Sequence, residues 1–104
     1  MTETSAPILS HFSNSGIVQL PGRRFPAIAM PGDTVLTLYD CLLRVLQEAK
    51  QRRDEDSYYE IFPFAGMLEE QLLHYEQALE KANVTFPWPG SIRDKPLKED
   101  YDEA

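Results

Sequence analysis

Apolar side chains recur at alternating steps of four and three residues through the second half of the chain. These positions are Ile61, Ala65, Leu68, Leu72, Tyr75, Leu79 and Ala82. Because an α-helix turns once in about 3.6 residues, this spacing places all of them on one face. The pattern predicts an amphipathic helix that begins at a capping box of Ser57 and Glu60 and ends at a left-handed cap at Asn83. Pro63 predicts either a kink or a main helix that begins at Pro63 after a short turn.

Another amphipathic helix is predicted earlier, from about Thr34 to Arg53, with the Asp33 carboxylate as its N-cap. Its apolar residues form two adjacent stripes, Val35, Leu38, Leu42, Val45 and Ala49 in one and Leu36, Tyr39, Leu43 and Leu46 in the other. So wide an apolar face predicts a central helix, covered by the later helix on one flank and by strands on the other. The short connection Asp54-Glu55-Asp56 predicts that the two helices pack antiparallel as a hairpin.

From Ile8 to Met30 the residues favour extended structure broken by turns. One turn is expected at Ser13-Asn14-Ser15-Gly16, and another at Leu20-Pro21-Gly22, where glycine accepts a positive φ. Pro26 has no amide hydrogen to donate, so the strand that follows it should lie at an edge or be bulged. The sequence therefore predicts a short antiparallel β meander at the N-terminus.

The predicted fold class is α+β, with the meander packed on an antiparallel two-helix hairpin. Residues 1–90 should form a single domain, because 104 residues are too few for two independent cores. Residues 91–104 should form an extended acidic C-terminal tail that stays mobile unless a partner holds it.

Charge narrows the partners that this chain can have. Seventeen acidic and ten basic side chains give a net charge of −7, which disfavours nucleic acids and anionic membranes and favours a cationic protein surface. The N-terminus has no charged and apolar leader, and no run approaches the roughly 20 apolar residues of a bilayer span. We therefore expect a cytoplasmic protein.

Residue types that support catalysis are scattered. His11 and His74 lie in different predicted elements without a second ligand at metal-binding spacing, and Cys41, the only cysteine, is expected to be a buried and inert thiol. The adjacent pair Arg23-Arg24 could bind a carboxylate or phosphate, although an ion pair with an acidic helix is favoured. We expect no catalytic residue, no metal and no cofactor, and therefore no enzyme.

Acidic side chains recur at helical spacing in the later helix, which predicts a negative stripe on its outer face, extended by the tail. Aromatic side chains nearby are of the types enriched at binding hot spots. The candidate partner-binding residues are Glu69, Glu70, Glu76, Glu80, Tyr58, Tyr59, Trp88, Asp100, Tyr101, Asp102 and Glu103. The alternatives are a helix face that is merely solvated and aromatic residues that belong to the core.

Three segments together form a pattern: Leu20-Pro21-Gly22-Arg23-Arg24-Phe25-Pro26, Gly32-Asp33 opening one helix, and His74-Tyr75-Glu76 late in the other. This pattern resembles a family of small uncharacterised bacterial proteins over roughly Val18 to Trp88. One difference is Ala27, where such proteins have glycine. The resemblance implies a bacterial origin, and it implies no activity or catalytic residues.

Small, acidic, single-domain bacterial proteins are also similar in general character to immunity proteins, which neutralise a cognate toxin. By this analogy, the leading hypothesis is an immunity protein or another inhibitory protein that binds a cationic partner, such as a toxin domain, through its acidic surface. The alternative is a homodimer in which two helical hairpins form a four-helix bundle with a structural or adaptor role. A toxin gene immediately upstream would favour the first hypothesis, and a strict monomer in light scattering would count against the second.

Overall fold

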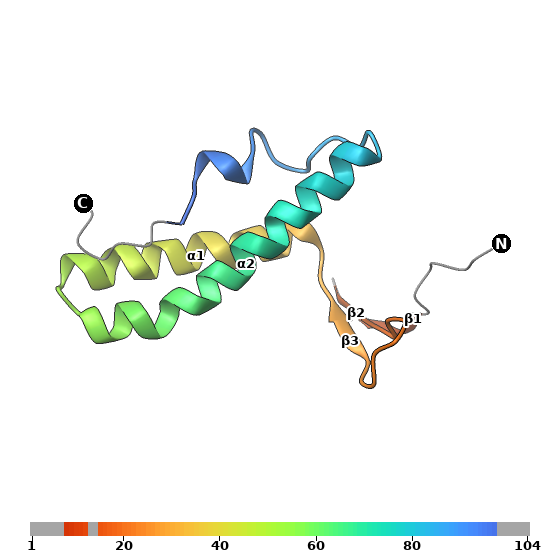
Figure 1. The fold of residues 1–104 in the computed structure, drawn as a ribbon, viewed down its shortest axis with the longest axis horizontal. Helices are drawn as coiled ribbons and strands as arrows, with labels where there is room; N and C mark the ends of the chain where they lie inside the picture. Colours follow the sequence, from red (N-terminus) through yellow and green to blue (C-terminus); the bar gives the residue numbers. More distant parts are fainter. Residues whose placement is uncertain (1–7, 13–14, 98–104) are drawn as a thin grey trace. The chain divides into compact units, whose positions relative to one another are not determined.

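A computed structural model describes residues 8–12 and 15–97 of the chain. Its elements are the strands β1 (Ile8–Phe12), β2 (Ser15–Val18) and β3 (Ala27–Ala29), the helices α1 (Gly32–Gln51) and α2 (Glu55–Lys81), and the short 3-10 helix η1 (Ile92–Asp94) (Figure 1). This set of strands and helices confirms the predicted α+β class. The chain divides into two compact units, a strand unit (Met1–Pro31) and a helical unit (Gly32–Ala104). The single domain over residues 1–90 and the packing of strands on helices stay predictions.

The strand unit is an antiparallel sheet in the order β1-β2-β3, as the predicted meander requires. In the pairing of β2 with β3, Ile17 lies opposite Ile28. The pairing of β1 with β2 shifts register between Ile8 and Ser10. β3 is an edge strand directly after Pro26, so the missing amide hydrogen removes no bond from the middle of the sheet.

Of the two predicted turns, the second is confirmed. The Arg23 amide donates to the Leu20 carbonyl at 3.2 Å, and Gly22 between them has φ 74°. The first turn is wrong in its second half, because Ser15 and Gly16 already belong to β2, where pairing with β1 satisfies their backbone groups. Residues 13–14 lie outside the described part of the chain.

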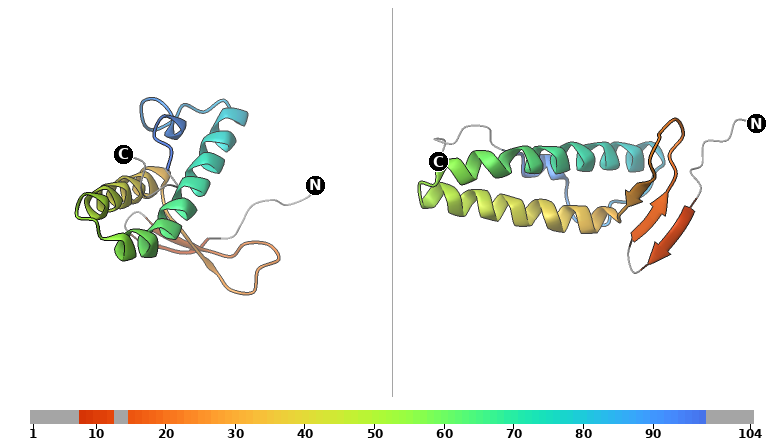
Figure 2. Two further views of the ribbon diagram at one scale, coloured as in Figure 1. Left: turned by 60° about the vertical axis from the view of Figure 1, so that its left-hand side comes forward. Right: turned by 90° about the horizontal axis from the view of Figure 1, so that it is seen from below.

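The helical unit is built on the predicted hairpin, with α1 and α2 running antiparallel side by side (Figure 2). Its buried core residues form two clusters, one of Leu46, Ala49, Tyr58 and Ala65, and the other of Tyr39, Leu72 and Ile92. The predicted apolar face of α2, which we call its seam, therefore points inward at Ala65 and Leu72. In α1, by contrast, Leu38 and Val45 of the first stripe remain exposed.

α1 begins at Gly32, so Asp33 lies inside its first turn, and the predicted N-cap role of Asp33 is wrong. The early start has a packing reason. Gly32 is buried, and a Cβ atom at this position would collide with the ring of Tyr75 on α2. Only glycine lets the first turn of α1 come this close to α2.

The N-cap of α2 is Asp54, and the predicted capping box of Ser57 and Glu60 is wrong. The Ser57 amide donates to Asp54 Oδ1 at 3.2 Å, so the helix starts earlier than the box would allow. Hydrogen bonds from Ser57 also lower the pKa of Asp54. α2 runs without a break through Pro63, which rules out a separate start there, and its first turns lie at an angle to the rest (Figure 1).

The C-terminal end of α2 confirms the predicted cap. Asn83 has φ 57°, and the Val84 amide donates to the Leu79 carbonyl at 2.9 Å. The Asn83 amide also donates to the Glu80 carbonyl at 3.2 Å. This arrangement is a Schellman motif, in which hydrogen bonds local to the helix end satisfy its last carbonyls.

Residues 91–97 correct the predicted tail. They were expected to be extended and mobile, but they contain η1 and return across the helices, and Ile92 within them is buried (Figure 2). The hydrophobic gain from burying Ile92 explains why this charged segment is ordered. Residues 98–104 lie outside the described part of the chain.

Candidate partner-binding faces of the helical unit

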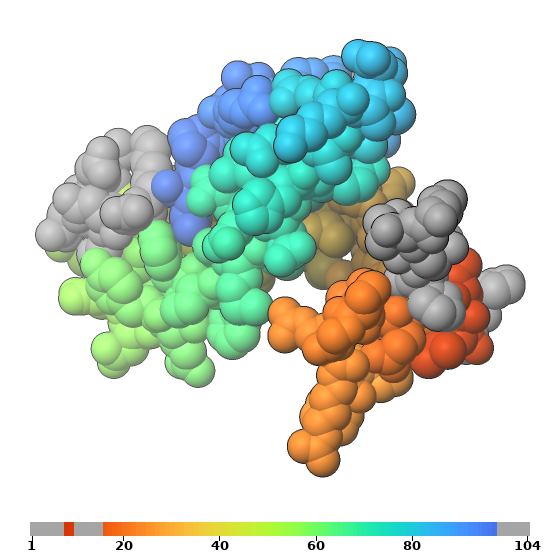
Figure 3. Space-filling view, turned by 45° about the vertical axis from the view of Figure 1, so that its right-hand side comes forward, coloured from red at the N-terminus to blue at the C-terminus, as the bar shows by residue number. Residues whose placement is uncertain are grey.

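Residues 88–97 form a strap that crosses both helices of the hairpin, and in the space-filling view its blue atoms lie flush against α2 (Figure 3). Ile92 anchors the strap in the cluster of Tyr39 and Leu72. The local sequence shapes it, because Ser91 and Asp94 form a capping box that starts η1, with bonds of 3.1 and 3.2 Å.

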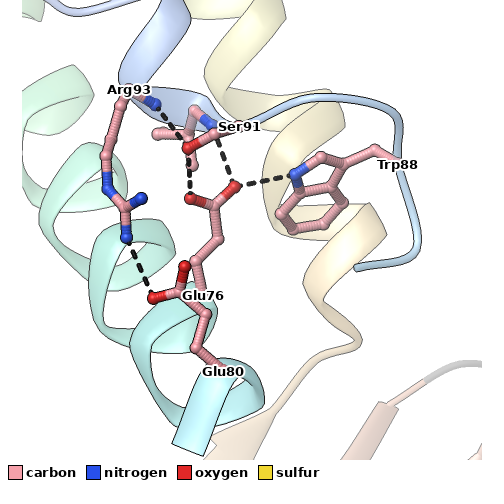
Figure 4. Close-up of polar contacts among 6 residues, drawn as sticks. Glu76, Glu80, Trp88, Ser91 and Arg93 are labelled. Carbon is pink, nitrogen blue, oxygen red and sulfur yellow. Dashed lines mark hydrogen bonds and ion pairs between the residues drawn. The ribbon is translucent and has the colours of Figure 1, made fainter. Parts of the chain in front are cut away.

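Glu76 on α2 binds the strap through its carboxylate. Its side chain is fully buried, with 0% exposed, and it accepts three hydrogen bonds (Figure 4). The donors are Trp88 Nε1 at 2.9 Å, Ser91 Oγ at 2.7 Å and the Ile92 amide at 2.8 Å. All three donors are neutral and all three belong to the strap. The carboxylate therefore accepts hydrogen bonds from N–H and O–H groups within the core.

Two further glutamates of α2 contact the strap on either side of Glu76. Arg93 Nη2 lies 3.1 Å from Glu80 Oε1 in an ion pair that is half exposed (Figure 4). The Leu97 amide donates to Glu69 Oε2 at 2.8 Å. We call Glu69, Glu76 and Glu80 the glutamate row.

The prediction that the glutamate row displays its charge outward is wrong at Glu76. Sequence spacing contained the signal. Glu69 and Glu76 alternate with Ala65 and Leu72 at steps of four, three and four, so they lie on the apolar face of α2. The strap then covers them, and only Glu80 of the row and the neighbouring Glu70 are exposed.

On the α1 side the strap makes contacts near Lys95. Tyr39 Oη donates to the Lys95 carbonyl at 3.0 Å, and Lys95 Nζ lies 3.2 Å from Asp40 Oδ1 in an exposed ion pair. Burial first, and then the nearby Glu69 carboxylate, raise the pKa of Tyr39. The strap thus ties α1 to α2, and the phenol of Tyr39 lies where all three segments meet.

The predicted aromatic contact residues separate into core and surface. Tyr58 is buried, with its ring centroid 5.2 Å from Tyr59 and 5.8 Å from Phe62, whereas Tyr59 is exposed. Trp88 is half-buried, and its ring centroid lies 5.6 Å from that of Tyr75. Burial makes Tyr58 a core residue, as the alternative interpretation proposed. The tail candidates Asp100, Tyr101, Asp102 and Glu103 lie outside the described residues.

A second face of the hairpin was not identified from the sequence. An apolar groove of about 270 Å³ lies between α1 and α2, lined by Leu38, Cys41, Leu42, Phe64, Met67 and Leu68. Phe64 is 59% exposed, Met67 63% and Leu38 43%. We call it the open groove. The available signal was the pair Phe64 and Met67, three residues apart and offset from the seam of α2.

Cys41 lines the open groove, so the prediction of a buried thiol is corrected to a half-buried one. Arg44 Nη2 donates to Cys41 Sγ at 2.9 Å, one helical turn away. Arg24, in the strand unit, lies over the ring of Phe25 at 5.1 Å. The predicted ion pair of Arg23-Arg24 with an acidic helix would join the two units and stays a prediction.

Residues 8–12 and 15–97 contain no group of three or more histidine, cysteine, aspartate or glutamate side chains that could hold a metal ion. Neither α1 nor α2 combines the length and the apolar character of a bilayer-spanning helix.

Comparison with protein families shows a match to DUF6959, a family of unknown function, over residues 1–88. The chain belongs to this family. Membership of an uncharacterised family was predicted and is confirmed in that general form. Neither the curated proteins nor the solved structures contain a significant match. The family match includes α1 and α2 and stops within the strap, at Trp88.

Proposed function

We propose that this member of DUF6959 is a protein-binding module without catalytic activity, and that the open groove receives an apolar segment of its partner. The observation that carries the proposal is the exposure of Phe64 and Met67, 59% and 63%, beside Leu38 in one continuous apolar groove. Contiguous exposed apolar surface is uncommon in soluble proteins and is typical of contact sites. Grooves between two helices commonly accept the apolar face of a third helix.

The charges around the open groove define the partner further. Glu60 precedes Phe64 by one helical turn, Glu70 follows Met67 by three residues, and both are exposed. Arg44, a nearby cation, is engaged with Cys41. With a net charge of −7 for the whole chain, these acids favour a segment whose apolar anchors are flanked by lysine or arginine.

We propose that the biological role of this binding is to neutralise a toxin. Its support is the small size and the negative charge of the chain, which suit association with a cationic toxin domain. The sequence placed the partner contact on the glutamate row. Because the strap engages the carboxylates of this row, we assign the contact to the open groove instead. A toxin gene beside the gene for this chain, and binding of that toxin through the open groove, would support this form.

Homodimerisation through the open groove is the competing use of the same surface. A groove-to-groove contact would bring Glu60 and Glu70 of one copy close to the same acids of the other. Like charges at an interface oppose association, so the charge pattern favours a cationic partner over a second copy.

A synthetic amphipathic peptide tests the proposal. The probe has leucine anchors flanked by lysines, and its control replaces the lysines by glutamates. We expect the full chain to bind the lysine peptide at least about tenfold more tightly than the glutamate peptide in calorimetry. The variant F64S/M67S should lose this binding, and V84S, which changes a residue that is 50% exposed outside the groove, should keep it.

Two outcomes would overturn the proposal. One is equal affinity of F64S/M67S and V84S for the lysine peptide. The other is a dimer in light scattering that F64S/M67S converts to a monomer, because this result would assign the open groove to self-association.

A further inference from the structure

The strap lies on its helices in the manner of a bound peptide. We propose that its seat, formed by Tyr39, Leu72, Glu76 and Glu80, is a second peptide-binding site of this protein. Residues 88–97 occupy this seat as an intramolecular ligand, and a partner segment of the same chemistry takes their place. None of these four residues lines the open groove, although Leu68 of the groove packs against the cluster that contains Tyr39, Leu72 and Ile92.

The strap shows which ligand the seat recognises. Ile92 is the aliphatic anchor, 1% exposed in its cluster. Directly before it, Ser91 donates its hydroxyl to Glu76, which also accepts the backbone amide of Ile92. Directly after it, Arg93 pairs with Glu80. A fitting ligand is therefore a protein segment with a hydroxyl residue, an aliphatic residue and a basic residue in succession, in which the hydroxyl residue caps one turn of 3-10 helix.

The chemistry of Glu76 makes strap binding reversible. Dehydrating a carboxylate opposes docking, and here only neutral groups offset that cost, because each of the three donors on Glu76 is uncharged. When the strap leaves, water hydrates the carboxylate again. The many contacts of the strap therefore give less net stability than an equal number of apolar contacts would.

The strap and its seat are also separable along the chain. α2 ends in hydrogen bonds of its own, from the Val84 amide to the Leu79 carbonyl, so the helix keeps its cap without the strap. The family match contains the seat but stops at Trp88, before the anchor Ile92. In this chain, the four residues of the seat therefore lie inside the matched region, and the anchor Ile92 lies beyond it.

An external segment must compete with a tethered one. A short linker holds the strap near its seat at an effective concentration on the order of millimolar, so the native chain binds an external peptide weakly. Loosening the strap without altering the seat should then raise the affinity for the same peptide. This expectation distinguishes an occupied binding site from an ordinary part of the core.

The test uses the full chain with the substitution I92A, which weakens the strap and spares its seat. The probe is a peptide with the sequence of residues 87–97 and phenylalanine in place of its tryptophan. Trp88, the only tryptophan of the chain, then reports release of the strap by a red shift in its emission. We expect I92A to bind the peptide at least about tenfold more tightly than the native chain.

Matched variants locate the binding. Adding E76Q to I92A should weaken peptide binding at least about tenfold, whereas adding E70Q, an exposed neighbour on α2, should leave it unchanged. The double change S91A/R93Q loosens the strap while keeping Ile92, and it replaces I92A should that variant fail to fold.

The proposal is overturned if no folded, loosened chain binds the peptide more tightly than the native chain, or if E70Q and E76Q weaken binding equally. Adding F64S/M67S to the loosened chain should leave peptide binding intact, which keeps this test independent of the open groove.

Discussion

Glu76 is a single residue that changes the interpretation of a whole face. A glutamate at this point of an acidic helix was expected to face solvent, yet it is buried and accepts three hydrogen bonds from the strap. Buried carboxylates are stable only when their oxygens have partners. The strap supplies these partners, so the burial of Glu76 and the order of the strap depend on each other.

Substitution of Glu76 by alanine tests this dependence. The change leaves the Trp88 indole N–H and the Ile92 amide without their acceptor, and unmade bonds of buried donors are costly. We expect the free energy of unfolding to fall by about 2 to 4 kcal/mol in urea denaturation. Glu70→Ala, on the exposed side of α2, should change it by less than about 0.5 kcal/mol. Equal effects of the two substitutions would contradict the assigned role of Glu76.

At the scale of elements, the two helices are positioned by features at their ends. Asp54 starts α2 by accepting the Ser57 amide, and Asn83 ends it with a positive φ. At the start of α1, Gly32 lies beneath the ring of Tyr75. These local features fix where each helix begins and ends, and the apolar seams between them fix how the helices pair.

Gly32 provides a prediction at this scale. Gly32→Ala would place a methyl group against the Tyr75 ring, and we expect a loss of about 1 to 3 kcal/mol in thermal or urea unfolding. Gly66→Ala is the control, because its nearest neighbour, Leu97 Cδ2, would lie at an ordinary 3.8 Å. In the interior of α2 that change should stabilise the protein by about 0.5 to 1 kcal/mol. A loss in both variants would show that the contact with Tyr75 is not the cause.

At the scale of the whole molecule, one of the two core clusters of the helical unit is closed by three segments. α1 contributes Tyr39, α2 contributes Leu72, and the strap contributes Ile92. The open groove lies outside these clusters of buried residues, although its members Leu42 and Leu68 pack against them. On the two proposals above, the helical unit has one partner-binding surface that is open and a second that its own chain occupies.

Tyr39 makes the closed core sensitive to alkaline pH. Burial and Glu69 raise its pKa above the ordinary value of 10.0, so the folded state retains a proton that the unfolded state loses. This contribution to stability is complete below about pH 10 and decreases as the pH rises beyond it. Urea unfolding at pH 9 to 11 should show this decrease in the native chain, with a smaller decrease in Tyr39→Phe. Parallel pH profiles would contradict the prediction.

The sequence by itself determined the helices, the meander, the turn at Gly22, the cap at Asn83 and the inward seam of α2. These features depend on the spacing of apolar residues and on local backbone preferences, which are properties of neighbouring residues. The sequence did not determine that Phe64 and Met67 would stay exposed, because the exposure of a side chain depends on which other segments pack against it.

Sequence spacing places Glu69 and Glu76 on the apolar face of α2, but only the tertiary structure decided that residues 91–97 are ordered and cover them. A charged segment beyond the last helix has the composition of a mobile tail, and only a cavity of matching shape and hydrogen-bonding groups can order it. Ile92 and Glu76 are 16 residues apart in sequence, and their hydrogen bond forms only once the hairpin has created the seat. Contacts between distant residues depend on the folded shape, and local patterns do not contain that information.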